Sequence, residues 1–361
     1  MPESEDSSED EVRESLEPSD EEGCLIAKLC QEGGVFALSH FLISKAISPI
    51  AEETSPKEWT YRDILQLPKE CLEEWRQACM RELNTLHKRG VYDLAECPSG
   101  HKVIKNHWVF DVKDDSRKRA RLVAKGFSQV EGMDYDQVFS PVVCFETVCL
   151  VLAMVALENW VAYGLDVCNA YLYGELDKEI WMEQPEGFKD TTRPNHILRL
   201  KCALYRLKQA GLAWWQALKQ SMEGLGFVSL SSDAGVFVYK KTGHFIIAII
   251  YVDNAIFLGP NRLLVNTMKE AFTRRWESRD LGELTEFLRM RITREGSSIH
   301  LDQCAYLQTV LQRCGMQNAK AAITPLPAGY FPIPSEELAD PERRSRFQTV
   351  IGSLLYLMLG T

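Results

Sequence analysis

The stretch from Phe245 to Gly259, FIIAIIYVDNAIFLG, constrains the fold of this chain more than any other segment. It is apolar on both sides of one polar pair, Asp253 and Asn254, and it is long enough for two buried strands. Because both polar residues tolerate left-handed backbone angles, the pattern predicts a β-hairpin that turns at this pair. We therefore expect antiparallel strands in the core of the protein.

The polar pair has two explanations. In the first, Asp253 and Asn254 serve only to reverse the chain. In the second, the turn brings both side chains to one edge of a sheet, where they bind a cation together with a third acidic group. Asp166 is the candidate for this group, because it ends another apolar strand. Buried carboxylates are costly alone, and a neighbouring pair can hold Mg²⁺.

The acidic charge of the chain is confined to its beginning. Residues 1–22 hold 11 acidic side chains and one basic side chain, which accounts for the whole formal net charge of -10. We expect residues 1–55 to form an acidic, mostly disordered arm and linker, whose protein partner is unknown. The remainder is neutral, so the acidic composition does not exclude nucleic acid as a partner.

Cysteine spacing and hydropathy argue against two other classes of protein. The 11 cysteines form no C-x-x-C pair, and the histidines do not lie at zinc-finger spacing. The longest apolar run, 148–157, is too short to span a bilayer and predicts a buried helix. No signal segment is visible at the N-terminus. We expect an intracellular protein, cytoplasmic or nuclear, that is neither secreted nor bound to a membrane.

Helices and strands alternate along the chain without the spacing of a parallel sheet. A helix of about 20 residues is predicted after Pro68, from its 3.6-residue periodicity. Two β-rich runs, 101–113 and 119–129, predict a basic hairpin. Further helices are expected within 204–227, near 266–276 and near 305–316, with a strand pair within 286–303. The expected fold class is α+β.

Several motifs occur in a characteristic order: WVFDVK, RARLVAKGFSQVEGMDYDQVFSPV, LDVCNAYLYGEL, MEQPEGF, LYRLKQAGLAWW, YVDN, DLGELTEFL, TPL and IGSLLYL. Over about residues 72–361, this order resembles the reverse transcriptase of copia-type LTR retrotransposons. The resemblance implies a right-hand polymerase with an antiparallel palm sheet backed by helices, fingers, and a complete or partial thumb. It places fingers and palm in 56–264, the end of the palm and a thumb-like part in 265–330, and a linker with the start of a truncated connection or RNase H region in 331–361.

The resemblance also assigns roles to individual residues. Asp166 and Asp253 are implied to hold two Mg²⁺ or Mn²⁺ ions, with Asn254 beside them. Tyr171 stands where the family usually has Phe, under the nucleotide sugar, and excludes a 2′-hydroxyl. The remaining implied nucleotide contacts are Lys113 and Arg121 of the fingers hairpin, and Gln209 of the LKQ motif. The implied partners are an RNA or DNA template with its primer, and deoxynucleoside triphosphates.

Each of these residues also has a plainer explanation. Tyr171 suits a core aromatic, the basic hairpin suits a solvated face, and Gln209 suits a polar position before a helix. Template and primer binding is expected to be electrostatic and independent of sequence. Composition alone makes candidates of Arg274, Arg275, Arg289, Arg291 and Arg294.

The chain departs from the family pattern at three positions. Asn254 replaces the second aspartate of Tyr-Val-Asp-Asp, which keeps one acceptor oxygen but removes a negative charge beside the expected ions. This predicts weakened metal binding and reduced synthesis. Arg206 and Arg289 replace glycines, and we expect disturbance wherever those glycines allow close backbone approach.

Three functions remain open from the sequence. The first is an RNA-directed DNA polymerase with synthesis impaired by Asn254. The second is a catalytically dead fragment of a retroelement that keeps the fold and nucleic-acid binding. The third, an unrelated metal-dependent nuclease, is disfavoured by the order of the motifs. The resemblance also leads us to expect a fragment of a longer Pol polyprotein, because an RNase H domain is expected after the last motif.

Overall fold

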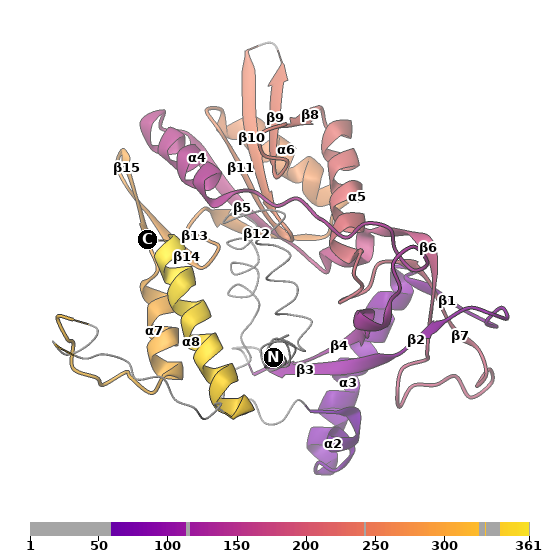
Figure 1. The fold of residues 1–361 in the computed structure, drawn as a ribbon. Coiled ribbons are helices and arrows are strands. Elements are labelled where there is room, and N and C mark those ends of the chain that lie inside the picture. Colours follow the sequence, from indigo (N-terminus) through magenta and orange to yellow (C-terminus); the bar gives the residue numbers. More distant parts are fainter. Residues whose placement is uncertain (1–58, 113–115, 242, 325–328, 330–339, 361) are drawn as a thin grey trace, which may run out of the picture. The chain divides into compact units, whose positions relative to one another are not determined.

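The computed structural model describes residues 59–112, 116–241, 243–324, 329 and 340–360 (Figure 1). They fall in two compact units, the described parts of Thr54–Phe287 with Ile292–His300, and of Leu288–Arg291 with Leu301–Thr361. The predicted acidic arm 1–55 and Lys113 lie outside the described residues. Most of the linker predicted to begin at residue 331 does so too.

A six-stranded sheet organises the larger unit, with the strand order β12-β5-β11-β10-β9-β8. Every pairing in this sheet is antiparallel. The strands are β5 (Val161–Val167), β8 (Phe227–Ser229), β9 (Val236–Lys241), β10 (His244–Tyr251), β11 (Asn254–Gly259) and β12 (Ser278–Glu283). The hairpin predicted from residues 245–259 is confirmed as β10 and β11.

The position of the turn differs from the prediction by one residue. Tyr251 pairs with Asn254, so the turn consists of Val252 and Asp253 rather than Asp253 and Asn254. Asn254 is extended because it pairs with Tyr251 on one side and with Asp166 on the other. The residue with a left-handed backbone in this turn is Val252, with φ +56°.

Two helices of this unit share an apolar core with the sheet. Helices α5 (Ala210–Gly224) and α6 (Arg262–Arg275) bury Trp214 and Phe272 against Phe257 and neighbouring sheet residues. Helix α4 (Phe145–Leu157) covers the predicted buried run 148–157, but Leu150 is 63% exposed and Leu157 is 83% exposed. The predicted helix is confirmed and is buried on one face, but the prediction of burial is wrong for the face that carries Leu150 and Leu157. The run is uniformly apolar and carries no periodicity that would have revealed its exposed face.

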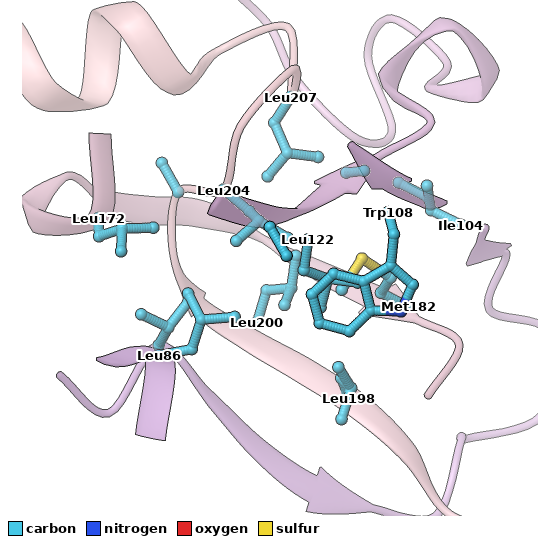
Figure 2. Close-up of a cluster of buried hydrophobic side chains, with 14 of the residues drawn as sticks. Leu86, Ile104, Trp108, Leu122, Leu172, Met182, Leu198, Leu200, Leu204 and Leu207 are labelled. Carbon is cyan, nitrogen blue, oxygen red and sulfur yellow. The ribbon is translucent and has the colours of Figure 1, made fainter. Parts of the chain in front are cut away.

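A second apolar cluster joins two smaller sheets to helix α3 (Lys69–Lys88), which confirms the predicted helix after Pro68. One sheet is the predicted hairpin, β3 (Asn106–Val112) with β4 (Lys118–Ala124). The other has the order β1-β7-β6-β2. Its strands are β1 (Tyr92–Ala95), β2 (Val103–Ile104), β6 (Glu175–Met182) and β7 (Ile197–Cys202). Figure 2 shows Leu86, Trp108, Leu122 and Leu198 converging from these elements.

Short helices complete the larger unit. They are α2 (Tyr61–Leu65) and the 3₁₀ turns η1 (Gly126–Ser128) and η2 (Ala170–Tyr173). Tyr61 and Ile64 of α2 belong to the same buried cluster as α3. Turn η2 begins three residues after β5 ends at Val167, so it lies close to Asp166 in the chain.

The smaller unit contains helices α7 (Cys304–Arg313) and α8 (Pro341–Gly360). Tyr306 and Tyr356 pack edge to face between them, with ring centroids 4.8 Å apart. A three-stranded sheet of β13 (Glu286–Phe287), β14 (Met290–Glu295) and β15 (Ser298–Asp302) precedes them in the chain and corresponds to the predicted strand pair. In the described part of the chain, no helix combines the length and apolarity needed to cross a membrane.

Candidate functional site

Three polar side chains form a row across the edge of the six-stranded sheet. Asp166 on β5 lies opposite Asn254 on β11 and opposite Arg279 on β12. Directly paired residues of antiparallel strands point to the same face, so the three side chains are neighbours. Arg279 Nη2 donates to Asp166 Oδ2 at 2.8 Å. The carboxylate of Asp166 therefore has a resident positive partner.

The turn carrying Asp253 is docked on the end of β5. The Val167 N–H donates to the Asp253 carbonyl oxygen at 2.7 Å. The side-chain amide of Asn254 donates to Asp253 Oδ1 at 3.1 Å. Burial raises the pKa of Asp253, and the negative charge of Asp166 raises it further. The structure thus brings together the two carboxylates that are 87 positions apart in the sequence.

A buried tryptophan fixes the geometry of this turn. Trp214 on α5 is 2% exposed, and its indole N–H donates to the Val252 carbonyl oxygen at 2.7 Å. Its ring packs on Trp276 with a centroid separation of 5.1 Å. A β-branched residue at positive φ is strained and persists where its surroundings determine the backbone. Trp214 supplies such a constraint for Val252.

Tyr171 lies beside the same turn. It belongs to η2, two residues after Asn169, which takes φ +54°. Burial raises the pKa of Tyr171, and the charge of Asp253 raises it further. Burial raises the pKa of Tyr251, and the charges of Tyr171 and Asp253 raise it further. Tyr171 is half-buried and packs against both apolar clusters of the unit.

Two arginines of the β3–β4 hairpin influence the site electrostatically. Arg119 and Arg121 occupy alternate positions of β4 and so share a face of the strand. Both lower the pKa of Asp253, against the raising effect of burial. Burial is the largest cause that lowers the pKa of Arg121 itself. The sequence prediction includes Arg121 but assigns no role to Arg119, although strand alternation alone links the two.

Gln209 lies at the start of α5, in a buried network of polar side chains. It is 4% exposed, its Nε2 donates to the Asp134 carbonyl at 2.8 Å, and its Oε1 accepts from Gln129 at 2.9 Å. Gln129 Oε1 in turn accepts from the Lys208 N–H at 2.8 Å. Both ends of the side-chain amide thus have partners inside the protein, and the nucleotide contact of Gln209 stays a prediction. This network ties the start of α5 to the segment after β4.

Both arginines that replace family glycines have left-handed backbones. Arg206 has φ +65° and Arg289 has φ +57°. Glycine suits these positions because a Cβ there is strained by about 1–2 kcal/mol. A close approach does occur nearby, because a Cβ on Gly126 would lie 1.9 Å from the Arg206 carbonyl oxygen. The glycine that this contact requires is therefore Gly126, which the chain retains.

Internal partners account for two of the arginines that composition made candidates for template binding. Arg291 Nε donates to Asp302 Oδ2 at 2.7 Å. Arg294 donates to the Trp160 carbonyl at 2.7 Å and to Asn159 Oδ1 at 2.5 Å. These contacts give both side chains structural roles, and they weaken the case for either as a phosphate ligand.

The donor set of the row fits a divalent cation by chemical type. Asp166 and Asp253 offer carboxylate oxygens and Asn254 an amide oxygen, and hard oxygen donors suit Mg²⁺ and Mn²⁺. Only two of the three are charged, and one of these pairs with Arg279. Among the residues that the structure describes, no three His, Cys, Asp or Glu side chains are grouped so that they could hold a metal ion.

Comparison with known proteins identifies the family. A family model described as reverse transcriptase (RNA-dependent DNA polymerase) matches residues 89–328. The chain is 33% identical over 327 residues to the retrovirus-related Pol polyprotein from transposon TNT 1-94 of Nicotiana tabacum, covering 86% of this chain and 24% of that protein. It is 34% identical over 322 residues to the Pol polyprotein from transposon RE1 of Arabidopsis thaliana, covering 87% of this chain and 21% of that protein. The chain thus spans about a quarter or less of these relatives, and it belongs to the reverse transcriptase family in the form found in copia-type transposon Pol polyproteins.

Proposed function

We propose that this chain is an RNA-directed DNA polymerase domain whose synthesis is impaired by Asn254. One observation carries the proposal: the register of β5, β11 and β12 brings Asp166 to the turn that carries Asp253. In this proposal the six-stranded sheet is the palm, and α3 with the β3–β4 hairpin belongs to the fingers. The part after residue 264 contributes β12 to the palm and continues into the thumb-like region.

The two aspartates are the residues that would hold Mg²⁺ or Mn²⁺, with two ions expected. When bound, such ions stabilise the charge on the attacking and leaving oxygens of a phosphoryl transfer. Asn254 retains an acceptor oxygen but contributes no charge, so the site attracts cations less strongly. Each 1.4 kcal/mol lost in this way reduces occupancy or rate about tenfold.

The groups around Asp253 supply the proposed nucleotide contacts. Arg119 and Arg121 bring positive charge toward the carboxylate, as a triphosphate beside it requires. Tyr171 lies next to Asp253, where its ring would pack under the sugar and exclude a 2′-hydroxyl. Lys113 stays a predicted contact. Gln209 acts in this proposal by holding the segment before α5 in place.

The substrates are a deoxynucleoside triphosphate and a template with its primer. The matched relatives are Pol polyproteins of transposons, which makes an RNA template the first choice. Contacts with the template backbone would be electrostatic and would weaken as salt concentration rises.

A second function is binding of nucleic acid without synthesis. The ion pair between Asp166 and Arg279 favours it, because that carboxylate is already neutralised. Asn254 favours it as well, since it removes a charge from the same row.

Primer extension on a primed RNA template separates these functions. The natural chain is compared with Asn254→Asp, in Mg²⁺ and in Mn²⁺. Asn261→Asp is the matched control: it adds the same charge at the exposed N-cap of α6, where Asp caps as well as Asn. We expect Asn254→Asp to raise extension by about tenfold or more and Asn261→Asp to leave it unchanged. Extension by neither chain, with binding retained, supports the second function, and degradation of the template would indicate a nuclease.

A further inference from the structure

We propose that Arg279 is a built-in counter-cation for Asp166, so that a divalent ion enters this site only by displacing the guanidinium. The inference rests on the proposed function for the class of ligand, a divalent cation. It adds a residue that controls the affinity of the site and that belongs to neither the predicted metal ligands nor the predicted nucleotide contacts.

The backbone places Arg279 opposite Asp166, so their pairing does not depend only on the side-chain conformation of Arg279. It lies opposite Asp166 in the β12–β5 register. On one side of it, the Cys168 N–H donates to the Glu277 carbonyl at 2.8 Å, which extends the pairing. On the other side, Lys269 Nζ holds the carboxylate of Asp280 at 2.8 Å. The chain is therefore held in place on both sides of Arg279, at Glu277 and at Asp280.

The other acidic groups near Arg279 have partners of their own, so Arg279 pairs with Asp166. Glu277, two residues before Arg279 and immediately before β12 begins, accepts from Arg89 Nη2 at 3.0 Å. The Arg89 side chain is 12% exposed and stacks over the Tyr173 ring at 4.1 Å, so it is held in place. Asp253 accepts from the amide of Asn254. Each carboxylate at this edge thus has a partner from the protein itself.

The exposure of the pair allows exchange without unfolding. The side chain of Arg279 is 67% exposed, whereas that of Asp166 is 28% exposed. The guanidinium is free to swing into solvent while Asp166 stays on its strand. Exposed ion pairs are weak, so the competition lowers cation affinity by about fivefold and does not abolish it.

Asn254 strengthens the effect of Arg279. With Asp at this position, Asp166 would face a second carboxylate across β11, and one guanidinium could not neutralise both. With Asn, the row Asn254–Asp166–Arg279 has no net charge. The exchange of one residue therefore changes the preferred occupant of the edge from a metal ion to the arginine.

The test is Mn²⁺ binding to the full chain without nucleic acid, followed by the electron paramagnetic resonance signal of free Mn²⁺. Arg279→Gln removes the competing charge, and Arg279→Lys keeps it. Arg262→Gln is the matched control, because the Arg262 side chain is as exposed as that of Arg279 and pairs with Glu283 of the same strand. Circular dichroism verifies that each variant is folded.

We expect Arg279→Gln to bind Mn²⁺ about fivefold more tightly, with Arg279→Lys and Arg262→Gln close to the natural chain. Asp166→Asn combined with Arg279→Gln should lose the gain. Equal or weaker binding by Arg279→Gln, or an equal gain in Arg262→Gln, overturns the inference. This test measures Mn²⁺ binding and no polymerisation. Its outcome therefore does not depend on whether the chain extends a primer.

Discussion

Glu82 and Asp253 are two carboxylates that sense the same pair of arginines, Arg119 and Arg121, from different regions of the larger unit. Glu82 lies on α3, is 9% exposed and accepts one backbone N–H, that of Leu122, at 3.4 Å. Asp253 lies in a turn at a sheet edge. Burial is the largest cause that raises the pKa of each, to about 7 for Glu82.

The difference lies in what surrounds each carboxylate. Leu86, one helical turn after Glu82, and Leu122 both point into the apolar cluster of Figure 2. Glu82 is buried beside these apolar side chains, so it takes up a proton more readily than an exposed carboxyl does, with a pKa of about 7. Asp253 has Asp166 and Asn254 beside it at an accessible edge. The same physical cost is a burden on stability in one region and, under the proposed function, a means of attracting a cation in the other.

The largest expected effect comes from breaking the turn that holds Asp253. Trp214→Ala removes a fully buried indole and the donor to the Val252 carbonyl. We expect unfolding free energy to fall by about 3–5 kcal/mol, measured by urea denaturation. Trp214→Phe keeps a ring but loses the donor and should cost about 1–3 kcal/mol. Equal losses in the two variants would show that the ring packing contributes nothing beyond the hydrogen bond, whereas no loss in Trp214→Phe would show that the hydrogen bond contributes nothing to the turn.

The second prediction concerns Glu82 and the pH dependence of stability. Its folded pKa of about 7 exceeds the ordinary value of 4.5, so the folded chain binds more protons between these values. The contribution of protonated Glu82 to the free energy of unfolding is fully present below about pH 4.5. It is lost as the pH rises to about 7 and above, by up to about 3 kcal/mol. Glu82→Gln removes the loss and should be the more stable chain at pH 8.

Urea unfolding of both chains from pH 5 to 8 measures this difference, since titrations elsewhere cancel. Glu70→Gln, on the exposed start of the same helix, is the control and should leave the pH dependence unchanged. A constant difference between Glu82→Gln and the natural chain across this range would mean that Glu82 stays ionised.

Asp253→Asn sharpens the comparison. The pKa of Asp253 is raised by burial, so its stabilising proton is also lost as pH rises, and the variant should gain stability at pH 8. The gain should be smaller than that of Glu82→Gln, because the turn is only partly buried. Only Asp253→Asn should lose Mn²⁺ binding. Loss of Mn²⁺ binding in Glu82→Gln as well would show that the two carboxylates are not functionally separate.

The apolar regions of the fold were predictable from the sequence. Periodicity located α3, and strand alternation with an apolar run located the hairpins β3–β4 and β10–β11. Helix α4 was the exception, because an unbroken apolar run gives no information about which side faces solvent. Strands β6 and β7 were not predicted, since short segments of mixed polarity resemble loops.

The site was predictable in part. Motif order selected Asp166, Asp253 and Tyr171, which the structure brings together. The pairing of Arg279 with Asp166 was not predictable, because it depends on the register between strands more than 100 residues apart. The burial of Gln209 was hidden for a related reason: its partners Gln129 and Asp134 come from a distant loop.

The smallest expected effect concerns the loop between β7 and α5, which carries Tyr205 and Arg206. Tyr205 in this loop donates to Asn169 Oδ1 at 3.0 Å and senses the charge of Glu82. The next residue, Arg206, is exposed and has φ +65°. Arg206→Gly should relieve the strain of the left-handed backbone, but glycine also adds entropy to the unfolded chain, which offsets part of the gain. We expect the free energy of unfolding to rise by about 0.5–1 kcal/mol.

Arg289→Gly is the matched comparison, because Arg289 has φ +57° but also stacks over the Tyr306 ring at 5.8 Å. Its loss of a cation–π contact of about 0.5–1 kcal/mol should cancel the relief of strain. Urea unfolding of each variant against the natural chain measures both. If Arg289→Gly stabilises as much as Arg206→Gly, the ring contact contributes nothing. If neither stabilises, the left-handed backbone at these positions is not strained, and arginine suits them as well as glycine.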